Sequence, residues 1–227
     1  MQQELLSFLS TSNEGINCSY SVYSKSFPFI VSGSNSHKFG KFCCLIASYI
    51  IIAATLLNGG MNKLYNVPNI HDTQMMFKIL ETLGCKIKKS NGKIIIDSKN
   101  VENYEIPENL MREMRSSVII AGALLARKKK VIFTYPGGCD IGSRPIDLHI
   151  KSFEKLGIKV KEEFGYIMCE ADEIVGNDIH LDFPSVGATI NIMLAAVKAK
   201  GKTIIDNAHA TALKILKDKK DIIEISL

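Results

Sequence analysis

Tryptophan is absent from this sequence of 227 residues, proline occurs only six times, and aromatic residues make up 7%. The six cysteines contain no CxxC pair, and the chain is long for a disulfide-stabilised miniprotein, so we expect reduced thiols and a cytoplasmic location. The five histidines show no spacing to cysteine or carboxylate that is typical of a metal site. The sequence therefore predicts no metal and no other cofactor.

Long apolar runs are also scarce. The longest, residues 42–57 (FCCLIASYIIIAATLL), is slightly short for a membrane span, and its flanks do not resemble those of a signal peptide. We therefore predict a buried helix and no membrane association. The net charge of +5 is mild, and basic residues cluster only at 128–130 and 214–220 without interleaved aromatics, so nucleic-acid binding is not expected. Small anionic substrates fit this charge.

What the sequence does contain is an internal repeat. Residues 78–92 (KILETLGCKIKKSNG) align without gaps on residues 151–165 (KSFEKLGIKVKEEFG). Each copy reads as an amphipathic helix that ends at a glycine, Gly84 or Gly157, followed by a short alternating strand and a turn. Three apolar helices, each followed by a β-rich run and spaced by about seventy residues, extend the pattern. We predict three α/β units packed around shared helices.

One loop, residues 136–149 (PGGCDIGSRPIDLH), carries the candidate chemistry. Cys139 lies on a stretch made flexible by glycines, and Arg144 precedes a helix start that Pro145 and Asp147 favour. Free N–H groups at that helix start, together with Arg144, form an anion site and favour the thiolate of Cys139. Composition leaves an alternative open. The loop can be a turn with a buried, inert cysteine, in which Arg144 and Asp147 form a surface ion pair.

This loop resembles the catalytic loop of the UDP-N-acetylglucosamine 1-carboxyvinyltransferase (enolpyruvyl transferase) family, which begins peptidoglycan precursor synthesis. Residues 113–127 resemble the arginine-led helix of that family, and residues 182–191 (DFPSVGATIN) resemble its second sugar-nucleotide loop. The resemblance runs from about residue 51 to residue 207. The resemblance implies an α/β fold of the enolpyruvyl-transferase type. Such a lobe consists of three repeated α/β units, with helices inside and mixed sheets outside.

The resemblance also implies a role for each matched residue. Cys139 would be the catalytic proton donor and would be able to trap phosphoenolpyruvate covalently. The substrate-binding residues for the nucleotide-sugar would be Arg115, Arg144, Pro145, Ile146, Asp147, Leu148, Ser185, Val186 and Gly187.

Simple local roles explain some of these residues equally well. Ser185 can cap the helix predicted over 186–198, and this role needs no ligand. Arg115 can be a surface arginine whose stem covers apolar neighbours. His149, in the helix that follows the loop, is expected to be a polar residue of the helix face and nothing more.

The resemblance ends abruptly on both sides. The family holds phosphoenolpyruvate with a lysine–asparagine pair, and counting back from Ile51 puts Leu45 and Ile46 at those positions. Beyond Asn207, a lysine-rich tail replaces the expected acidic helix. We therefore expect a divergent N-terminal segment (1–40) that packs poorly against the rest, an enolpyruvyl transferase lobe (41–210) and a divergent basic tail (211–227).

A truncated or frame-disrupted gene product fits these departures, because family members carry a second lobe that completes the site. The implied reaction transfers the enolpyruvyl group of phosphoenolpyruvate to the 3-hydroxyl of UDP-N-acetylglucosamine, and little turnover is expected of this chain alone. A complementing lobe on another polypeptide is one expected partner. The alternatives are a non-catalytic fragment that binds a nucleotide-sugar or a partner lobe, and a product without function.

Overall fold

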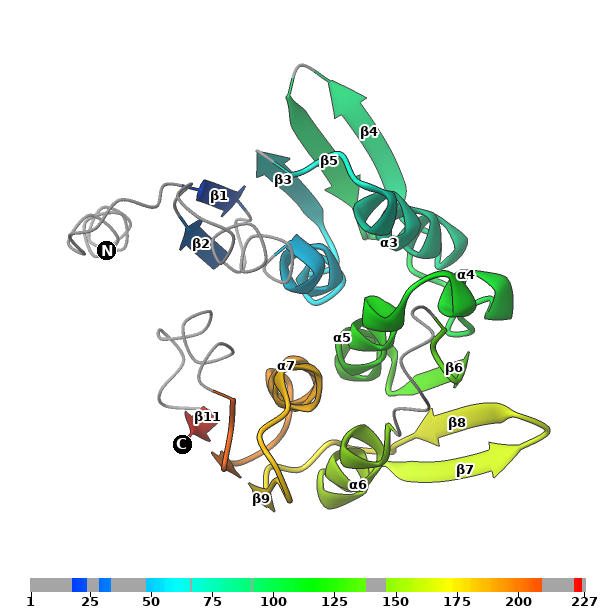
Figure 1. The fold of residues 1–227 in the computed structure, drawn as a ribbon, viewed down its shortest axis with the longest axis vertical. Coiled ribbons are helices and arrows are strands. Elements are labelled where there is room, and N and C mark those ends of the chain that lie inside the picture. The colour runs from blue at the N-terminus through cyan, green and yellow to red at the C-terminus, as the bar shows by residue number, and fades with distance from the viewer. Residues whose placement is uncertain are drawn as a thin grey trace.

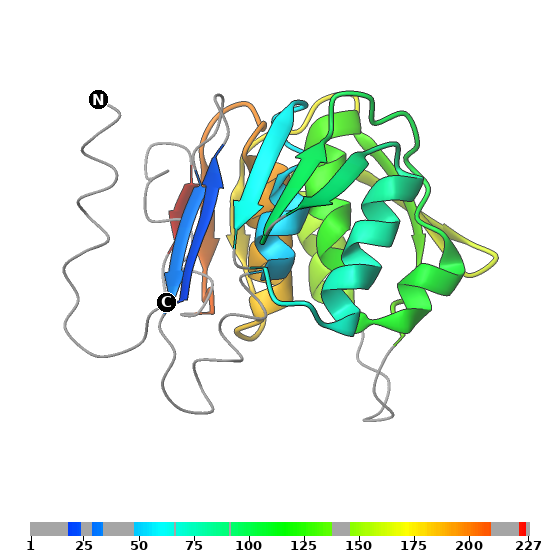
Figure 2. The ribbon, with the colours of Figure 1, turned by 90° about the horizontal axis from the view of Figure 1, so that it is seen from above.

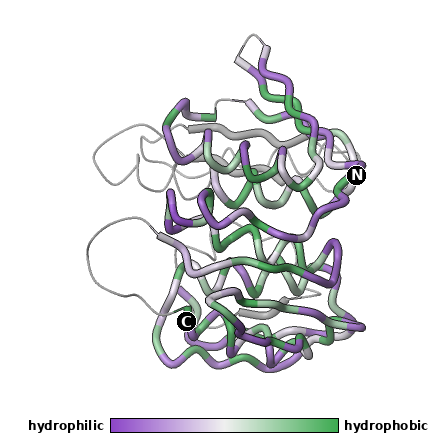
Figure 3. The backbone as a smooth tube through the Cα atoms, turned by 90° about the vertical axis from the view of Figure 1, so that its right-hand side faces the viewer, coloured by the Kyte–Doolittle hydropathy of each residue, from purple (hydrophilic) through white to green (hydrophobic). Residues whose placement is uncertain are grey.

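The helices of this protein lie together in the interior, and three sheets lie around them (Figure 1). Hydrophobic residues recur along the inner helices, whereas they alternate with hydrophilic residues in the hairpin that projects at the top of Figure 3. This is the layering that the family resemblance implied. The computed structural model describes residues 18–23, 29–33, 48–65, 67–90, 92–137, 146–209 and 223–225.

Two of the predicted repeats have the same topology. The first contains β3 (Met61–Tyr65), α3 (His71–Thr82), β4 (Lys86–Ser90) and β5 (Lys93–Asp97). The second contains β6 (Lys130–Thr134), α6 (Asp147–Lys155), β7 (Lys159–Glu163) and β8 (Tyr166–Glu170). In both, the last strand lies between the other two and is antiparallel to each. The ungapped sequence match is therefore confirmed as a structural repeat.

Glycine ends the corresponding helices α3 and α6, as predicted. Gly84 has a φ of +105° and Gly157 a φ of +80°, which a residue with a Cβ rarely adopts. The turn between β7 and β8 uses the same region of backbone space, with φ of 54° at Phe164 and 80° at Gly165. Two consecutive left-handed residues are typical of the type I′ turn of a tight hairpin.

A third unit continues the pattern with parallel strands. It contains β9 (Asp178–His180), α7 (Val186–Ala196) and β10 (Thr203–Asp206), and β9 is parallel to β10. The stretch before β6 has the same strand–helix–strand order. Glu105 forms a parallel bridge to Ile132 in β6, and helices lie between these two residues. Those helices are α4 (Glu108–Glu113), the 3₁₀ helix η1 (Arg115–Val118) and α5 (Ile119–Lys128). The strand β11 (Ile223–Ile225) is parallel to β10.

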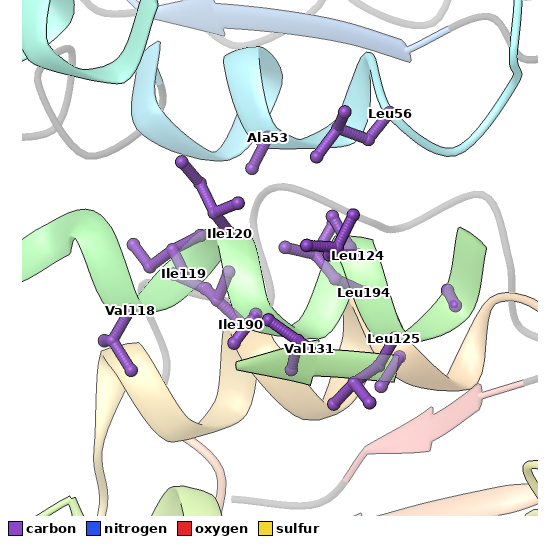
Figure 4. Close-up of a cluster of buried hydrophobic side chains, with 14 of the residues drawn as sticks. Ala53, Leu56, Val118, Ile119, Ile120, Leu124, Leu125, Val131, Ile190 and Leu194 are labelled. Carbon is purple, nitrogen blue, oxygen red and sulfur yellow. The ribbon is translucent and has the colours of Figure 1, made fainter. Parts of the chain in front are cut away.

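The core forms where three inner helices meet, namely the helix over residues 48–54, α5 and α7. Apolar side chains of all three, and of the turn after the first, gather at this contact in Figure 4, including Ala53, Leu56, Ile120, Leu124, Ile190 and Leu194, and all six are buried. The buried helix predicted within 42–57 is confirmed for the described residues 48–54. None of the helices that the structure describes is long and apolar enough to cross a membrane.

Two strands lie within the N-terminal segment that we expected to be separate. The strand β1 (Cys18–Tyr23) pairs with β2 (Phe29–Gly33) and also with β3, where Val22 lies opposite Leu64. Figure 2 shows β1 and β2 in blue. The expectation of poor packing is therefore wrong for these strands, because the edge of β3 offers N–H and C=O groups that pair with β1. The boundaries of the three predicted segments stay a prediction.

The approach of α5 to α7 leaves no room for a side chain at Gly122. A Cβ there would lie 2.5 Å from the backbone oxygen of Asn191 in α7. We expect Gly122→Ala to destabilise the protein by ~1–3 kcal/mol through overpacking, although helix propensity alone favours alanine by ~1 kcal/mol. Urea unfolding measures the difference. Gly60→Ala is the control, because its φ lies outside the left-handed region and the atom nearest to its Cβ position is Nδ2 of Asn58 at 3.9 Å. A stabilised Gly122→Ala variant would contradict the close helix contact.

Candidate functional site

The N-terminal ends of α5, α6 and α7 lie together in the structure. Asn191, in the second turn of α7, donates to the carbonyl oxygen of Val118, the N-cap of α5, over 2.9 Å. The same amide nitrogen lies 2.7 Å from Nδ1 of His149, in the first turn of α6. Helix N-terminal ends carry partial positive charge, so their convergence favours an anionic ligand.

The turn from Ser185 to Gly187 begins α7 as predicted. The Ser185 side chain accepts a hydrogen bond from the N–H of Ala188 at 3.3 Å, which confirms its capping role. Its carbonyl oxygen accepts from the N–H of Thr189 at 3.0 Å. No described residue accepts a hydrogen bond from the N–H groups of Val186 and Gly187. These two donors are therefore available to a ligand at this helix end.

Gly187 lies against the ring of His149. A Cβ at position 187 would lie 3.2 Å from Cε1 and 3.3 Å from Nε2 of the imidazole. The prediction that His149 is merely a polar residue of the helix face is wrong, because this side chain is only 8% exposed. The side chain of His149 is buried because it lies between α6 and α7. Desolvation, assisted by the charge of Arg115, lowers the pKa of His149 to about 4. The imidazole is therefore neutral at pH 7.

Asn191 is the residue of this site whose role the sequence did not reveal. It is fully buried, and its Oδ1 accepts from the N–H of Gly122 at 2.9 Å. With the bonds to Val118 and His149, this side chain joins α5, α6 and α7. A buried amide between apolar residues of a helix was the available signal, because such groups need hydrogen-bond partners.

The segment from Ile146 to Leu148 enters the site mainly through its backbone. Ile146 and Leu148 are buried, with 2% and 8% exposure, whereas the Asp147 side chain is exposed. Apolar side chains that face the core leave only main-chain groups for a ligand. The cavity of about 330 Å³ between α6 and β9 borders this segment at Leu148, and the ion pair of Lys151 and Asp182 lines it.

Arg115 does not begin a continuous helix over 113–127, as the sequence suggested. The helix α4 ends at Glu113, Arg115 opens η1, and α5 starts at Ile119. The Arg115 side chain is exposed, and its charge acts on His149. It therefore lies close enough to His149 for its charge to act there, and its role in substrate binding stays a prediction.

Cys139, Arg144 and Pro145 lie outside the described residues, so their roles stay predictions. The described residues that flank them are anchored. The N–H of Gly137 donates to the carbonyl of Met111 over 3.1 Å, and a Cβ at Gly137 would lie 2.0 Å from the carbonyl oxygen of Arg112. On the other side, Ile146 is buried in the core.

Two other cysteines contrast with the predicted reactive thiol. Cys85 precedes β4 and Cys169 lies in β8, and they are 5% and 0% exposed. Their predicted burial is confirmed. Desolvation by burial raises the pKa of both thiols to about 12, so both stay protonated and unreactive near neutral pH. Among the described residues, no group of three or more histidine, cysteine or acidic side chains is placed to hold a metal ion.

Comparison with known sequences gives one family. Residues 45–220 match the family model of EPSP synthase (3-phosphoshikimate 1-carboxyvinyltransferase). A UDP-N-acetylglucosamine 1-carboxyvinyltransferase 2 of Caldanaerobacter subterraneus subsp. tengcongensis is 54% identical over 158 residues, which are 70% of this chain and 38% of the relative. The corresponding protein of Carboxydothermus hydrogenoformans is 45% identical over 162 residues, 71% of this chain and 39% of the relative. The chain thus spans well under half the length of these relatives.

Solved structures agree with the fold. The enolpyruvyl transferase NikO from Streptomyces tendae superposes with a TM-score of 0.63 at 16% identity, over 77% of this chain and 41% of that one. An EPSP synthase from Acinetobacter baumannii superposes with a TM-score of 0.54 at 17% identity, over 69% of this chain and 37% of that one. The predicted fold class is thereby confirmed. By its sequence match and its fold, the chain belongs to the EPSP synthase family of enolpyruvyl transferases.

Proposed function

We propose that this chain carries the nucleotide-sugar half of an enolpyruvyl transferase site, with UDP-N-acetylglucosamine as the ligand. The observation that carries the proposal is the convergence of three helix N-terminal ends at Val118, His149 and Gly187. The names of the relatives support the choice of ligand. The reaction would be transfer of the enolpyruvyl group from phosphoenolpyruvate to the 3-hydroxyl of the sugar, the first committed step of peptidoglycan precursor synthesis.

The diphosphate of the nucleotide-sugar matches the charge of the site. The open N–H groups of Val186 and Gly187 lie at the positive end of α7 and would bind phosphate oxygens. Arg144 would add a charge-assisted hydrogen bond at the start of α6, and Arg115 would contribute charge from η1. Neutral His149 adds no positive charge of its own at pH 7. Recognition of the anion therefore depends on the two arginines and the helix ends.

Cys139 would supply the proton in the chemical step. When the sugar hydroxyl adds to phosphoenolpyruvate, the vinyl carbon must gain a proton, and phosphate then leaves. The phosphate and carboxylate of phosphoenolpyruvate also require cations beyond Arg115 and Arg144. We propose that a second lobe completes this half of the site, whether on the same polypeptide or on another. Binding of the nucleotide-sugar and turnover are then separable properties.

A site with these donors but open to water should bind UDP-N-acetylglucosamine weakly and with strong salt dependence. We expect Arg144→Ala to raise the Kd at least tenfold, because it removes a charge-assisted hydrogen bond to the ligand. Isothermal titration calorimetry at low and high salt measures both effects. Arg112→Ala is the matched control, because that side chain is exposed and pairs with Glu108 on α4. Equal affinities for the two variants would refute the assignment of Arg144.

The thiol of the proposed proton donor should be more reactive than the two buried thiols. We expect Cys139 to react with a thiol reagent at least tenfold faster than Cys85 or Cys169, because burial raises the pKa of the latter two to about 12. Labelling followed by peptide mass spectrometry gives the rate for each cysteine. Cys139→Ser should remove this signal and leave the labelling rates of Cys85 and Cys169 unchanged. The proposal fails if Cys139 reacts more slowly than both Cys85 and Cys169.

The low pKa of His149 predicts a specific acid sensitivity. The folded-state pKa of about 4 lies below the ordinary value of 6.5, so the unfolded chain binds the proton more readily. The contribution to stability is full above pH 6.5 and is lost as the pH falls towards 4, by about 3 kcal/mol in total. Urea unfolding at pH 7 and pH 4.5 should show a smaller pH effect for His149→Gln than for the wild type. Equal slopes would contradict a buried neutral imidazole.

A further inference from the structure

The side chain of Asn191 has only one possible orientation in its buried position. The N–H of Gly122 can only donate, so the group that faces it at 2.9 Å must be the amide oxygen. The carbonyl of Val118 can only accept, so the group that faces it at 2.9 Å must be the amide nitrogen. Two backbone groups of α5 and its N-cap therefore decide which end of the amide points towards His149.

This orientation decides the tautomer of His149. The amide nitrogen of Asn191 can only donate a hydrogen bond, and it lies 2.7 Å from Nδ1 of His149. Nδ1 must therefore accept, and a neutral imidazole with an accepting Nδ1 carries its proton on Nε2. Neutrality follows from the burial of the ring, which is only 8% exposed.

The proton on Nε2 lies beside the first turn of α7. Nε2 is 3.3 Å from the position that a Cβ of Gly187 would occupy, and no described residue forms a hydrogen bond with it. A glycine at this position keeps the nitrogen uncovered. The same turn holds the N–H groups of Val186 and Gly187, which also have no acceptor among the described residues. The Nε2–H of His149 and two backbone N–H groups therefore lie at the start of α7 without an acceptor among the described residues.

We propose that Asn191 is a positioning residue, which fixes His149 in the tautomer that presents an Nε2–H donor to the first turn of α7. The site then offers donors only, and it fits a ligand group that accepts, such as a phosphate or carbonyl oxygen. The opposite tautomer would place a lone pair there and repel the same oxygen. The effect on ligand binding rests on the proposed function, whereas the tautomer itself does not.

A purely structural role would have a different signature. If Asn191 served only to join the three helices, its replacement would change stability but not the site of the imidazole proton. Asn191→Asp separates the two roles, because a carboxylate is nearly the same size and can still accept from the N–H of Gly122, while it loses the bond to the Val118 carbonyl. It cannot donate to Nδ1. The proton should therefore move to Nδ1, and Nε2 should become an acceptor.

The test is a long-range proton–nitrogen NMR correlation of the histidine rings in the full chain at pH 7, with His149→Gln to identify the signals. In the wild type we expect a protonated Nε2 and an unprotonated Nδ1, with a scalar coupling across the hydrogen bond to the Asn191 amide nitrogen. In Asn191→Asp we expect the reverse tautomer. A wild type with a protonated Nδ1, or without that coupling, overturns the proposal even if the variant does not fold.

Asn62→Asp is the matched control. Asn62 is also buried, at 2% exposure, and its amide nitrogen donates to the backbone oxygens of Thr55 and Gly60 over 3.3 and 3.1 Å. These contacts lie beyond the C-terminal end of the helix over 48–54, so the His149 signals should not change. Signals that shift equally in the two variants, or a folded Asn191→Asp whose neutral ring keeps its proton on Nε2, would also overturn the proposal.

Titration with UDP-N-acetylglucosamine links the tautomer to the ligand. We expect Asn191→Asp to raise the Kd about tenfold, the effect of one lost hydrogen bond, and Asn62→Asp to leave it unchanged. An unchanged Kd in a variant with the reversed tautomer would refute the positioning role. If the wild type binds no UDP-N-acetylglucosamine, the proposed function fails, and the NMR measurement still decides whether Asn191 sets the tautomer.

Discussion

The contact between α5 and α7 at Gly122 is the constraint on which the rest of this structure depends. Only a residue without a Cβ allows the helices to approach so closely that the Gly122 N–H reaches the Asn191 side chain at 2.9 Å. Asn191 then reaches both Val118 and His149. One close helix contact therefore aligns the starts of α5, α6 and α7, and with them the candidate ligand site.

The repeated architecture explains why those starts lie on one side of the molecule. Each unit returns from a strand through a helix to the next strand, so α5 and α7 occupy equivalent positions and run in the same direction. The partial positive charges of these two helix ends add where the ends meet. His149, which is buried beside them, is neutral and adds no charge of its own. Backbone groups at these helix ends, together with the charge of Arg115, therefore favour an anionic ligand.

Several features could be read from local sequence because their causes are local. The glycines that end α3 and α6, the tight turn at Gly165 and the cap of Ser185 follow from backbone geometry and short-range hydrogen bonds. The burial of Cys169 follows from alternation along a strand. The 3₁₀ helix at Arg115 could not be read in this way, because an apolar run does not distinguish one long helix from two short ones.

The sequence by itself determined the repeat, the order of elements within its two copies, the family resemblance and the turn that begins α7. Only the tertiary structure decided that β1 joins the first sheet and that His149 is buried, neutral and bonded to Asn191. The physical reason is distance along the chain. Periodicity shows which face of a helix is apolar, but it does not show which residue, far away in sequence, will occupy that face. The tautomer of His149 depends on backbone groups of another repeat, and no local pattern contains that information.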